Sequence, residues 1–142
     1  MLGLWAAHLM FAEPVIQISQ HVRAGGSQLF SEFIATFGLL SVIWGCGRLR
    51  AEAVPFAVGL YITGAYWFTA STSFANPAVT LARAFTNTFA GIRPADAPGF
   101  ISAQLAGACA ATFLLRWLVP SLPKQAPDVV VPHTERALSH GR

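Results

Sequence analysis

Charged side chains are scarce in this sequence of 142 residues. Asp, Glu, Lys and Arg make up 11% of the chain, whereas hydrophobic residues make up 54%. A soluble domain typically has about a quarter charged residues and roughly 45–50% apolar ones. Because the mean hydropathy is also positive, at +0.54, the composition favours a protein that lies in a membrane.

Cysteine is scarce as well, and the sequence shows no pattern of catalytic residues. Cys46 and Cys109 match no metal-ligand spacing and form no disulfide framework. Each lies within or beside an apolar run, where cysteine usually acts as a small packing residue. The four histidines are isolated, and no Ser-His-Asp set, carboxylate pair or phosphate-binding loop occurs. We therefore expect no enzymatic activity, no metal site and no cofactor.

A recognisable leader peptide is also lacking. The apolar start, residues 1–11, has neither the basic region nor the small-residue cleavage site of a signal peptide. At about eleven residues it is too short to cross a bilayer. We expect it to be the end of a helix whose beginning is absent.

The sequence does contain apolar runs long enough to cross a bilayer. We expect three membrane-spanning helices, at about residues 29–45, 54–70 and 99–119. Ser27 is placed to cap the first of them, and the glycines and arginines of residues 45–50 end it as a membrane exit. The fold class expected is therefore an all-α membrane protein.

The cations give an orientation. The net charge is +3, and the cationic side chains are scattered beside the apolar runs. This distribution argues against a nucleic-acid partner and fits residues that flank membrane-spanning helices. Cytoplasmic loops are enriched in Lys and Arg, and the cations of the first loop and of the tail lie on one side of the membrane. We expect that side to be cytoplasmic, including a disordered tail over residues 121–142. Arg93 on the outer side is an exception.

One polar stretch interrupts the apolar runs. Asn76 is a good helix N-cap, and Pro77 suits the first helical position. The helix that follows has no breaker before about Phe89, which makes it roughly 18–20 Å long, about half the hydrocarbon thickness. Irregular backbone at membrane depth is tolerated only where it is buried or lines water. A half-helix that starts at Asn76 therefore predicts a cavity or pore.

Asn76-Pro77-Ala78, on a half-helix after a membrane span, resembles the signature box of the aquaporin, or major intrinsic protein, family. Glu32-Phe33-Ile34-Ala35-Thr36-Phe37 resembles the Glu-x-x-x-Thr-Phe pattern that opens each of the family's two inverted repeats. The resemblance implies half of an aquaporin-like right-handed bundle, with three transmembrane helices and one re-entrant half-helix. The orientation identifies residues 1–120 as similar to the second repeat of a bacterial member, in the cell inner membrane.

The resemblance also implies a chemistry for the box. The Asn76 carbonyl oxygen caps the half-helix, and its NH₂ group would donate to a solute in the pore. The helix N-terminus adds about half a positive charge at the same depth, which repels cations and lets neutral solutes pass. The site residues implied for the pore are Asn76, Pro77 and Ala78.

The implied selectivity filter departs from the family pattern. Val79 stands where the family usually has arginine, and Gly64 stands where water-selective members have histidine. Ser73 matches the remaining filter position in this half. Two large polar groups are thus absent, which predicts a wide filter for glycerol-like solutes or undissociated metalloid acids, with water as a further candidate.

Two charges remain inside the expected membrane region. Arg83 lies four residues after Val79 on one helix face and can reach back toward the outer pore. The alternative is that Arg83 anchors the outer vestibule or pairs with Asp96. By resemblance, Glu32 accepts hydrogen bonds from backbone N–H groups of the re-entrant loop.

The expected function is a passive channel for small neutral solutes in a lipid membrane, represented by its second half. The alternative is a truncated, non-conducting fragment, or a structural pairing subunit that needs a separate first half. The family forms homotetramers, and the small residues Ala103, Gly107 and Ala111 recur every four positions, which permits close helix packing. Whether they pack within one chain or between chains stays open.

Overall fold

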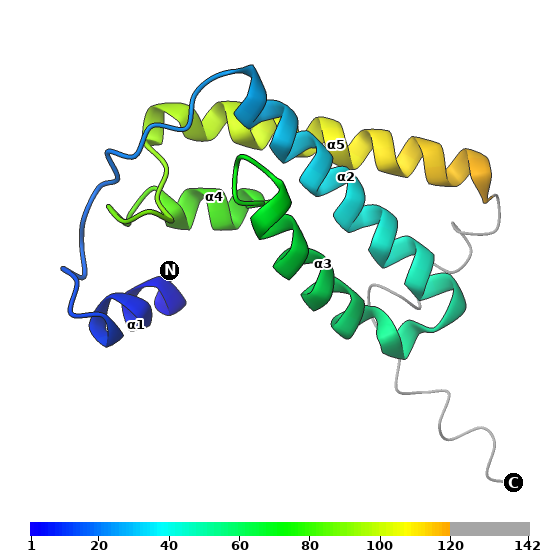
Figure 1. Ribbon diagram of the computed structural model, residues 1–142, viewed down its shortest axis with the longest axis horizontal. Helices are drawn as coiled ribbons and strands as arrows, with labels where there is room; N and C mark the ends of the chain where they lie inside the picture. Colours follow the sequence, from blue (N-terminus) through cyan, green and yellow to red (C-terminus); the bar gives the residue numbers. More distant parts are fainter. Residues whose placement is uncertain (120–142) are drawn as a thin grey trace, which may run out of the picture.

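The structure, a computed structural model, describes residues 1–119. All regular secondary structure in this range is helical (Figure 1), which confirms the expected all-α membrane fold. The 121–142 tail prediction lies outside the described residues. In chain order the elements are α1 (Leu2–Met10), α2 (Gly26–Leu49), the 3₁₀ turn η1 (Ala51–Ala53), α3 (Val54–Phe68), α4 (Pro77–Arg83), the 3₁₀ turn η2 (Pro94–Asp96) and α5 (Ala97–Leu118).

Helices α2 and α5 form the main body, packed side by side. Gly107 of α5 lies directly against α2, since a Cβ atom there would clash with the carbonyl oxygen of Phe33. Gly107 and Ala111 are both buried. The small-residue face of α5 therefore packs within the chain, which answers the question that the sequence left open.

Helix α3 returns along α2 after the η1 turn. The Tyr61 hydroxyl donates to the Ala35 carbonyl oxygen at 3.0 Å, and a Cβ atom at Gly38 would clash with the Tyr61 ring. Figure 1 shows that the C-terminal ends of α2 and α5 and the start of α3 point toward the same side of the molecule. This arrangement agrees with the expected order of the spans.

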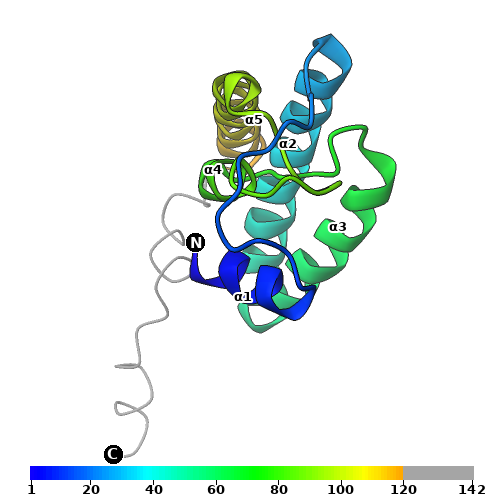
Figure 2. The ribbon, with the colours of Figure 1, turned by 90° about the vertical axis from the view of Figure 1, so that its left-hand side faces the viewer.

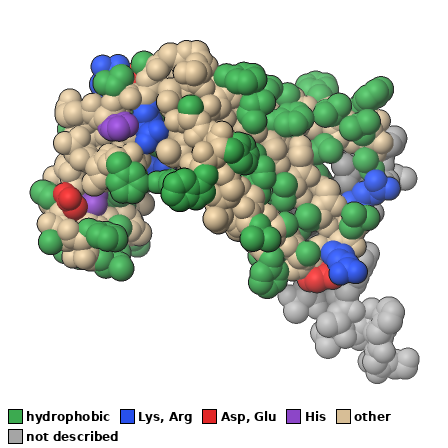
Figure 3. Space-filling model, viewed as in Figure 1, with side chains coloured by type: hydrophobic (Ala, Val, Ile, Leu, Met, Phe, Trp, Pro, Cys, Tyr) green, Lys and Arg blue, Asp and Glu red, His purple; other side chains and the backbone are tan. Residues whose placement is uncertain are grey.

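By length and composition, two helical stretches within residues 1–119 can cross a membrane, Gly26–Leu49 and Pro94–Leu118. Helix α3, expected over 54–70, has 15 residues, or about 22 Å at 1.5 Å per residue. Large hydrophobic side chains stay exposed on all three helices, among them Phe30, Trp67 and Phe113. Figure 3 shows such side chains spread over this surface, with the charged ones mostly at its edges, as expected for contact with lipid.

The start of α2 differs from the sequence expectation. The N-cap is Gly25 rather than Ser27, and no side chain caps the helix. Gly25 has φ +105°, a left-handed conformation that glycine adopts readily and other residues rarely do. It turns the chain from the extended segment before it directly into the helix, so that Ser27 already lies in the first turn.

The half-helix is shorter than expected. Helix α4 has seven residues and ends at Arg83, so the predicted continuation to Phe89 is wrong. The carbonyl oxygen of Arg83 accepts from the Ile92 N–H, and that of Ala84 accepts from the Ser19 N–H. Thr86 and Thr88 are poor helix formers with hydroxyls that bond locally. Contacts with distant segments therefore replace the next helical turn.

An extended segment, residues 11–25, connects α1 to α2 and crosses the outside of the α4 region. Figure 2 shows this connecting segment in front of α4, with α1 at its lower end. It is tied at both ends: the His8 ring of α1 hydrogen-bonds the Val15 carbonyl oxygen, and the Asn87 side chain accepts from the Gln20 N–H at 2.8 Å. The connecting segment thus forms one wall of the site.

Candidate functional site

Asn76 starts α4 as the sequence predicts. Its Oδ1 atom accepts from the N–H groups of Ala78 at 2.8 Å and Val79 at 3.3 Å, and Pro77 occupies the first helical turn. Because Oδ1 is held by two donors, the amide NH₂ group is directed away from them. Asn76, Pro77 and Ala78 are all exposed in this chain.

The loop that leads to Asn76 has an unusual backbone. Thr72, Ser73 and Ala75 have φ values of 61°, 49° and 47°. Left-handed φ is uncommon for residues other than glycine, and such positions persist only where surrounding contacts hold them. Ser73 and Ala75 are also buried. The polar contacts of this loop are therefore what keeps the entrance to α4 in place.

Glu32 supplies the first of these contacts. Its side chain is fully buried on α2, and its two oxygens accept from the Phe74 N–H at 2.8 Å and the Ala75 N–H at 2.9 Å. These are the hydrogen bonds that the family resemblance implied. They satisfy two backbone donors that have no other means of pairing in an apolar surrounding.

Gln104 of α5 completes the network, and the sequence analysis missed it. Its side-chain NH₂ group donates to Glu32 Oε2 at 2.6 Å and to Thr80 Oγ1 at 2.9 Å. Gln104 thereby joins α2, α4 and α5 through buried polar groups. The available signal was a single uncharged amide inside the last apolar run, on the helix face that also carries Gly107 and Ala111.

Phe74 lies at the centre of a small apolar cluster beneath the loop. Phe74, Ala84, Ile92 and Phe100 are its buried members, and Val79 packs against it from α4. The Phe74 and Phe100 rings meet edge to face at a centroid distance of 5.3 Å. The side chain of Val79 is therefore half-buried, with one side on this cluster.

The other two predicted filter residues lie in different surroundings. Ser73 is buried, and its hydroxyl has no hydrogen-bond partner among the described residues. Gly64 is exposed on α3, and a Cβ atom there would touch only the Phe68 ring, at 3.9 Å. Gly64 thus has open space beside it, whereas the Ser73 hydroxyl is enclosed by the chain.

Arg83 does not pair with Asp96, so that pairing is wrong, and the role of Arg83 at the outer vestibule stays a prediction. Asp96 Oδ1 instead accepts from Arg93 Nη2 at 2.8 Å. The Arg83 guanidinium carbon lies 4.3 Å from the centroid of the Phe74 ring. Its Nη1 atom is buried without a hydrogen-bond partner in the described part of the chain. Arg83 also lines a cavity of about 410 Å³, opposite Leu4 and Phe11.

Arg23 is a second residue of the site that the sequence reasoning missed. It is 5% exposed, and its guanidinium donates to the carbonyl oxygens of Gly91, Ser71 and Phe89 at 2.7, 2.9 and 2.8 Å. It therefore joins the loop before α4 to the loop after it. Nothing in the local sequence marks Arg23, because an arginine in a polar segment ordinarily faces solvent.

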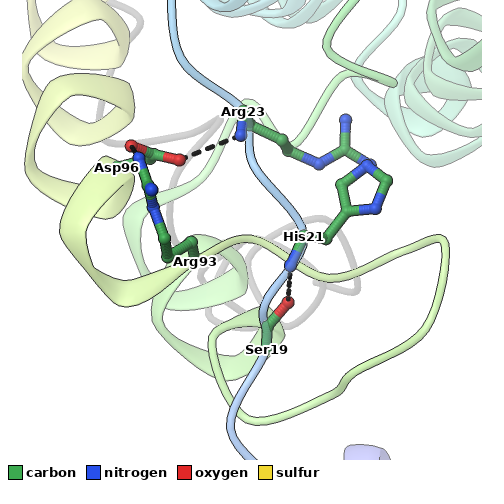
Figure 4. Close-up of polar contacts among 5 residues, drawn as sticks. All are labelled: Ser19, His21, Arg23, Arg93 and Asp96. Atoms are coloured by element: carbon green, nitrogen blue, oxygen red, sulfur yellow. Dashed lines mark hydrogen bonds and ion pairs between the residues drawn. The ribbon is translucent and has the colours of Figure 1, made fainter.

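The end of the site near η2 is closed by a second set of contacts (Figure 4). Asp96 Oδ2 accepts from the Arg23 N–H at 2.9 Å, and the Arg93 N–H donates to the His21 carbonyl oxygen at 2.7 Å. Because Arg93 pairs with Asp96, its charge on the expected outer side is locally balanced. No group of three or more His, Cys, Asp or Glu side chains that could hold a metal occurs within residues 1–119.

The fold and the site define an all-helical membrane protein built around a short capped helix that starts inside the body. A model of the major intrinsic protein family matches residues 45–141. The aquaglyceroporin AqpS of Rhizobium meliloti (strain 1021) is 59% identical over 122 residues, which are 85% of this chain and 52% of that protein. No solved structure matches the chain.

The chain belongs to the major intrinsic protein family, also called the aquaporin family, as the sequence predicts. Members of this family are membrane channels and not enzymes. The chain spans about half the length of the curated relative that it matches.

Proposed function

We propose that the chain contributes one half of a passive channel for small neutral solutes such as glycerol or undissociated metalloid acids. The observation that carries this proposal is the exposed Asn76 amide, whose Oδ1 is bound to the backbone of α4. Its NH₂ group is left to donate to a solute. The similar protein from Rhizobium meliloti is named an aquaglyceroporin, which supports glycerol-like solutes.

The filter residues support a wide constriction. Gly64 is exposed and has no side chain, Ser73 is small and buried, and Val79 is short and packs on the Phe74 cluster. An arginine or histidine at these positions would narrow the passage and add hydrogen-bond donors. The side chains present favour solutes larger than water.

A pore of this kind needs a second half-helix opposite α4. The 142 residues contain one Asn-Pro-Ala box, and the exposed surface of Asn76, Pro77 and Ala78 lies uncovered in this chain. The family's first repeat would cover it, and a homotetramer in the inner membrane, with the tail cytoplasmic, is the assembly that we propose. The same uncovered surface supports the alternative that the chain is a pairing subunit, or a truncated fragment, with no transport of its own.

Solute flux separates these functions. The full chain is reconstituted into lipid vesicles, and stopped-flow light scattering measures glycerol and water entry. Where a second copy of the chain supplies the opposite half-helix, we expect glycerol entry above that of empty vesicles, reduced about tenfold or more by Val79→Arg, because the long cationic side chain narrows the passage. Val79→Leu, which enlarges the side chain without charge, is the matched control. No flux above empty vesicles would rule out conduction by the chain alone and favour the pairing subunit.

A further inference from the structure

Two arginines from distant parts of the chain contact one aromatic ring. The guanidinium carbon of Arg23 lies 5.0 Å from the Phe74 ring centroid, and that of Arg83 lies 4.3 Å from it. Cations within about 6 Å of an aromatic centroid are attracted by the ring. Phe74 lies two residues before Asn76, so both positive charges sit beside the entrance to α4.

Arg23 is fixed by the fold. Within residues 1–119, its side-chain hydrogen bonds go to backbone carbonyl oxygens, those of Ser71, Phe89 and Gly91, and none goes to a carboxylate. Burial, and next the neighbouring Arg83 guanidinium, lower the pKa of Arg23 from its ordinary value, but arginine keeps its charge in proteins. Arg23 is therefore a positioned cation without a hydrogen-bonded carboxylate, and the buried Glu32 carboxylate offsets only part of its charge.

Arg83 is also without a carboxylate partner among the described residues, where Arg93 and Asp96 form the one ion pair. The buried Glu32 accepts from two backbone N–H groups and from Gln104. Arg83 lies four residues after Val79, so their Cβ atoms are neighbours about 5–6 Å apart on the helix. The Arg83 guanidinium reaches the Phe74 ring, and Val79 packs against the cluster around that ring, so the charge of Arg83 lies near Val79.

We propose that Arg83, with Arg23 behind it, supplies a positive potential beside Val79 and so determines the charge selectivity of this constriction. Arg83 contributes the field, and Arg23 is a positioning residue that also holds the loops around Phe74. This inference rests on the proposed channel function. Its consequence is a passage with a short apolar side chain at position 79 that nevertheless disfavours cations and favours neutral or anionic solutes.

Charged thiol reagents measure this potential without any flux. Val79→Cys is introduced into the full chain together with Cys46→Ser and Cys109→Ser, and the protein is studied in lipid vesicles. The rates of modification by an anionic sulfonate and by a cationic trimethylammonium methanethiosulfonate are compared, each relative to free cysteine. We expect the anionic reagent to be favoured about tenfold, as for one charge about 6 Å away in water, and less so at high salt.

Substitutions of the arginines then identify the source. Arg83→Gln should lower the ratio of anionic to cationic rates about tenfold, and Arg83→Lys, which keeps the charge, should restore most of it. Arg116→Gln at the far end of α5 is the control and should change nothing. Arg23→Lys should keep the ratio while loosening the loops, because lysine cannot reproduce the three directed hydrogen bonds.

A ratio that stays within about twofold after Arg83→Gln would overturn the inference, and so would equal ratios in the parent and in free cysteine. If Val79→Cys reacts with neither reagent, the exposed Ala78→Cys takes its place, and inertness of both would also overturn it. The Arg83 variants test the source of the potential even if the Arg23 variants fail to fold. Vesicles without glycerol flux would contradict the proposed channel function and not this inference, since the reagent rates need no transport.

Discussion

The α2–α5 pair and the loop that enters α4 are held together by opposite means. The two long helices approach through the absence of a side chain, because Gly107 lets α5 rest on the Phe33 backbone. The loop before α4 is held by long polar side chains, Glu32 and Arg23, that reach into it from elsewhere. The first region depends on shape over many residues, and the second depends on a few directed hydrogen bonds.

The two regions differ in how sensitive they are to the loss of a single side chain. Helices satisfy their own backbone groups in lipid, so their pairing needs only close packing. The backbone of a buried non-helical loop needs hydrogen-bond partners from other segments. Each partner that is removed leaves a buried polar group unpaired. We therefore expect single substitutions to damage the loop more than the helix pair.

Glu32→Ala should have the largest effect. It leaves the N–H groups of Phe74 and Ala75 and one donor of Gln104 without their acceptor. At about 1–3 kcal/mol for each buried group left unpaired, the loss of stability should be about 3 kcal/mol or more. Unfolding in detergent, followed by circular dichroism, measures it. Glu52→Ala, at an exposed acid in η1, is the control, and equal losses for the two variants would contradict the expectation.

Gly107→Val should have an intermediate effect. The added side chain meets the Phe33 backbone, which cannot move aside as a side chain can, so α5 must shift away from α2 at a cost of about 1–3 kcal/mol. Ala106→Val, one residue earlier on the exposed face of α5, is the matched control in the same unfolding experiment. If Gly107→Val cost more than Glu32→Ala, the contrast between the two regions would be reversed.

Much of the helical framework was predictable, because each helix is marked by a pattern in its own stretch of sequence. Apolar runs and the spacing of small residues placed α2, α3 and α5 to within a few residues, and Asn76 with Pro77 placed the start of α4. The end of α4 was not predictable, since it depends on Ser19 and Ile92 taking carbonyl oxygens that a further helical turn would have used.

The hydrogen bonds that Glu32, Gln104 and Arg23 make around the loop before α4 were the least predictable part. Glu32 was recognised through its family pattern, but Gln104 and Arg23 act on groups between 24 and 72 residues away in the sequence. Thr72, Ser73 and Ala75 have left-handed φ angles although none of them is glycine, so the residue type does not indicate this conformation. They follow from the contacts with Glu32 and Arg23, and contacts of this range leave no local pattern in a single sequence.

Asn76 offers the smallest and sharpest effect on stability. Asn76→Ala removes the acceptor of the Ala78 and Val79 N–H groups and should cost about 1 kcal/mol, the usual value of an N-cap. Asn76→Asp keeps the acceptor oxygen and should leave the free energy of unfolding nearly unchanged, because Asp caps helices as well as Asn does. It removes the NH₂ group, however, and adds a negative charge beside the helix N-terminus.

Glycerol entry should therefore fall in both variants, whereas stability should fall only in Asn76→Ala. Parallel losses of stability and flux in both variants would mean that Asn76 serves the loop's structure, like Glu32, and has no separate contact with the solute.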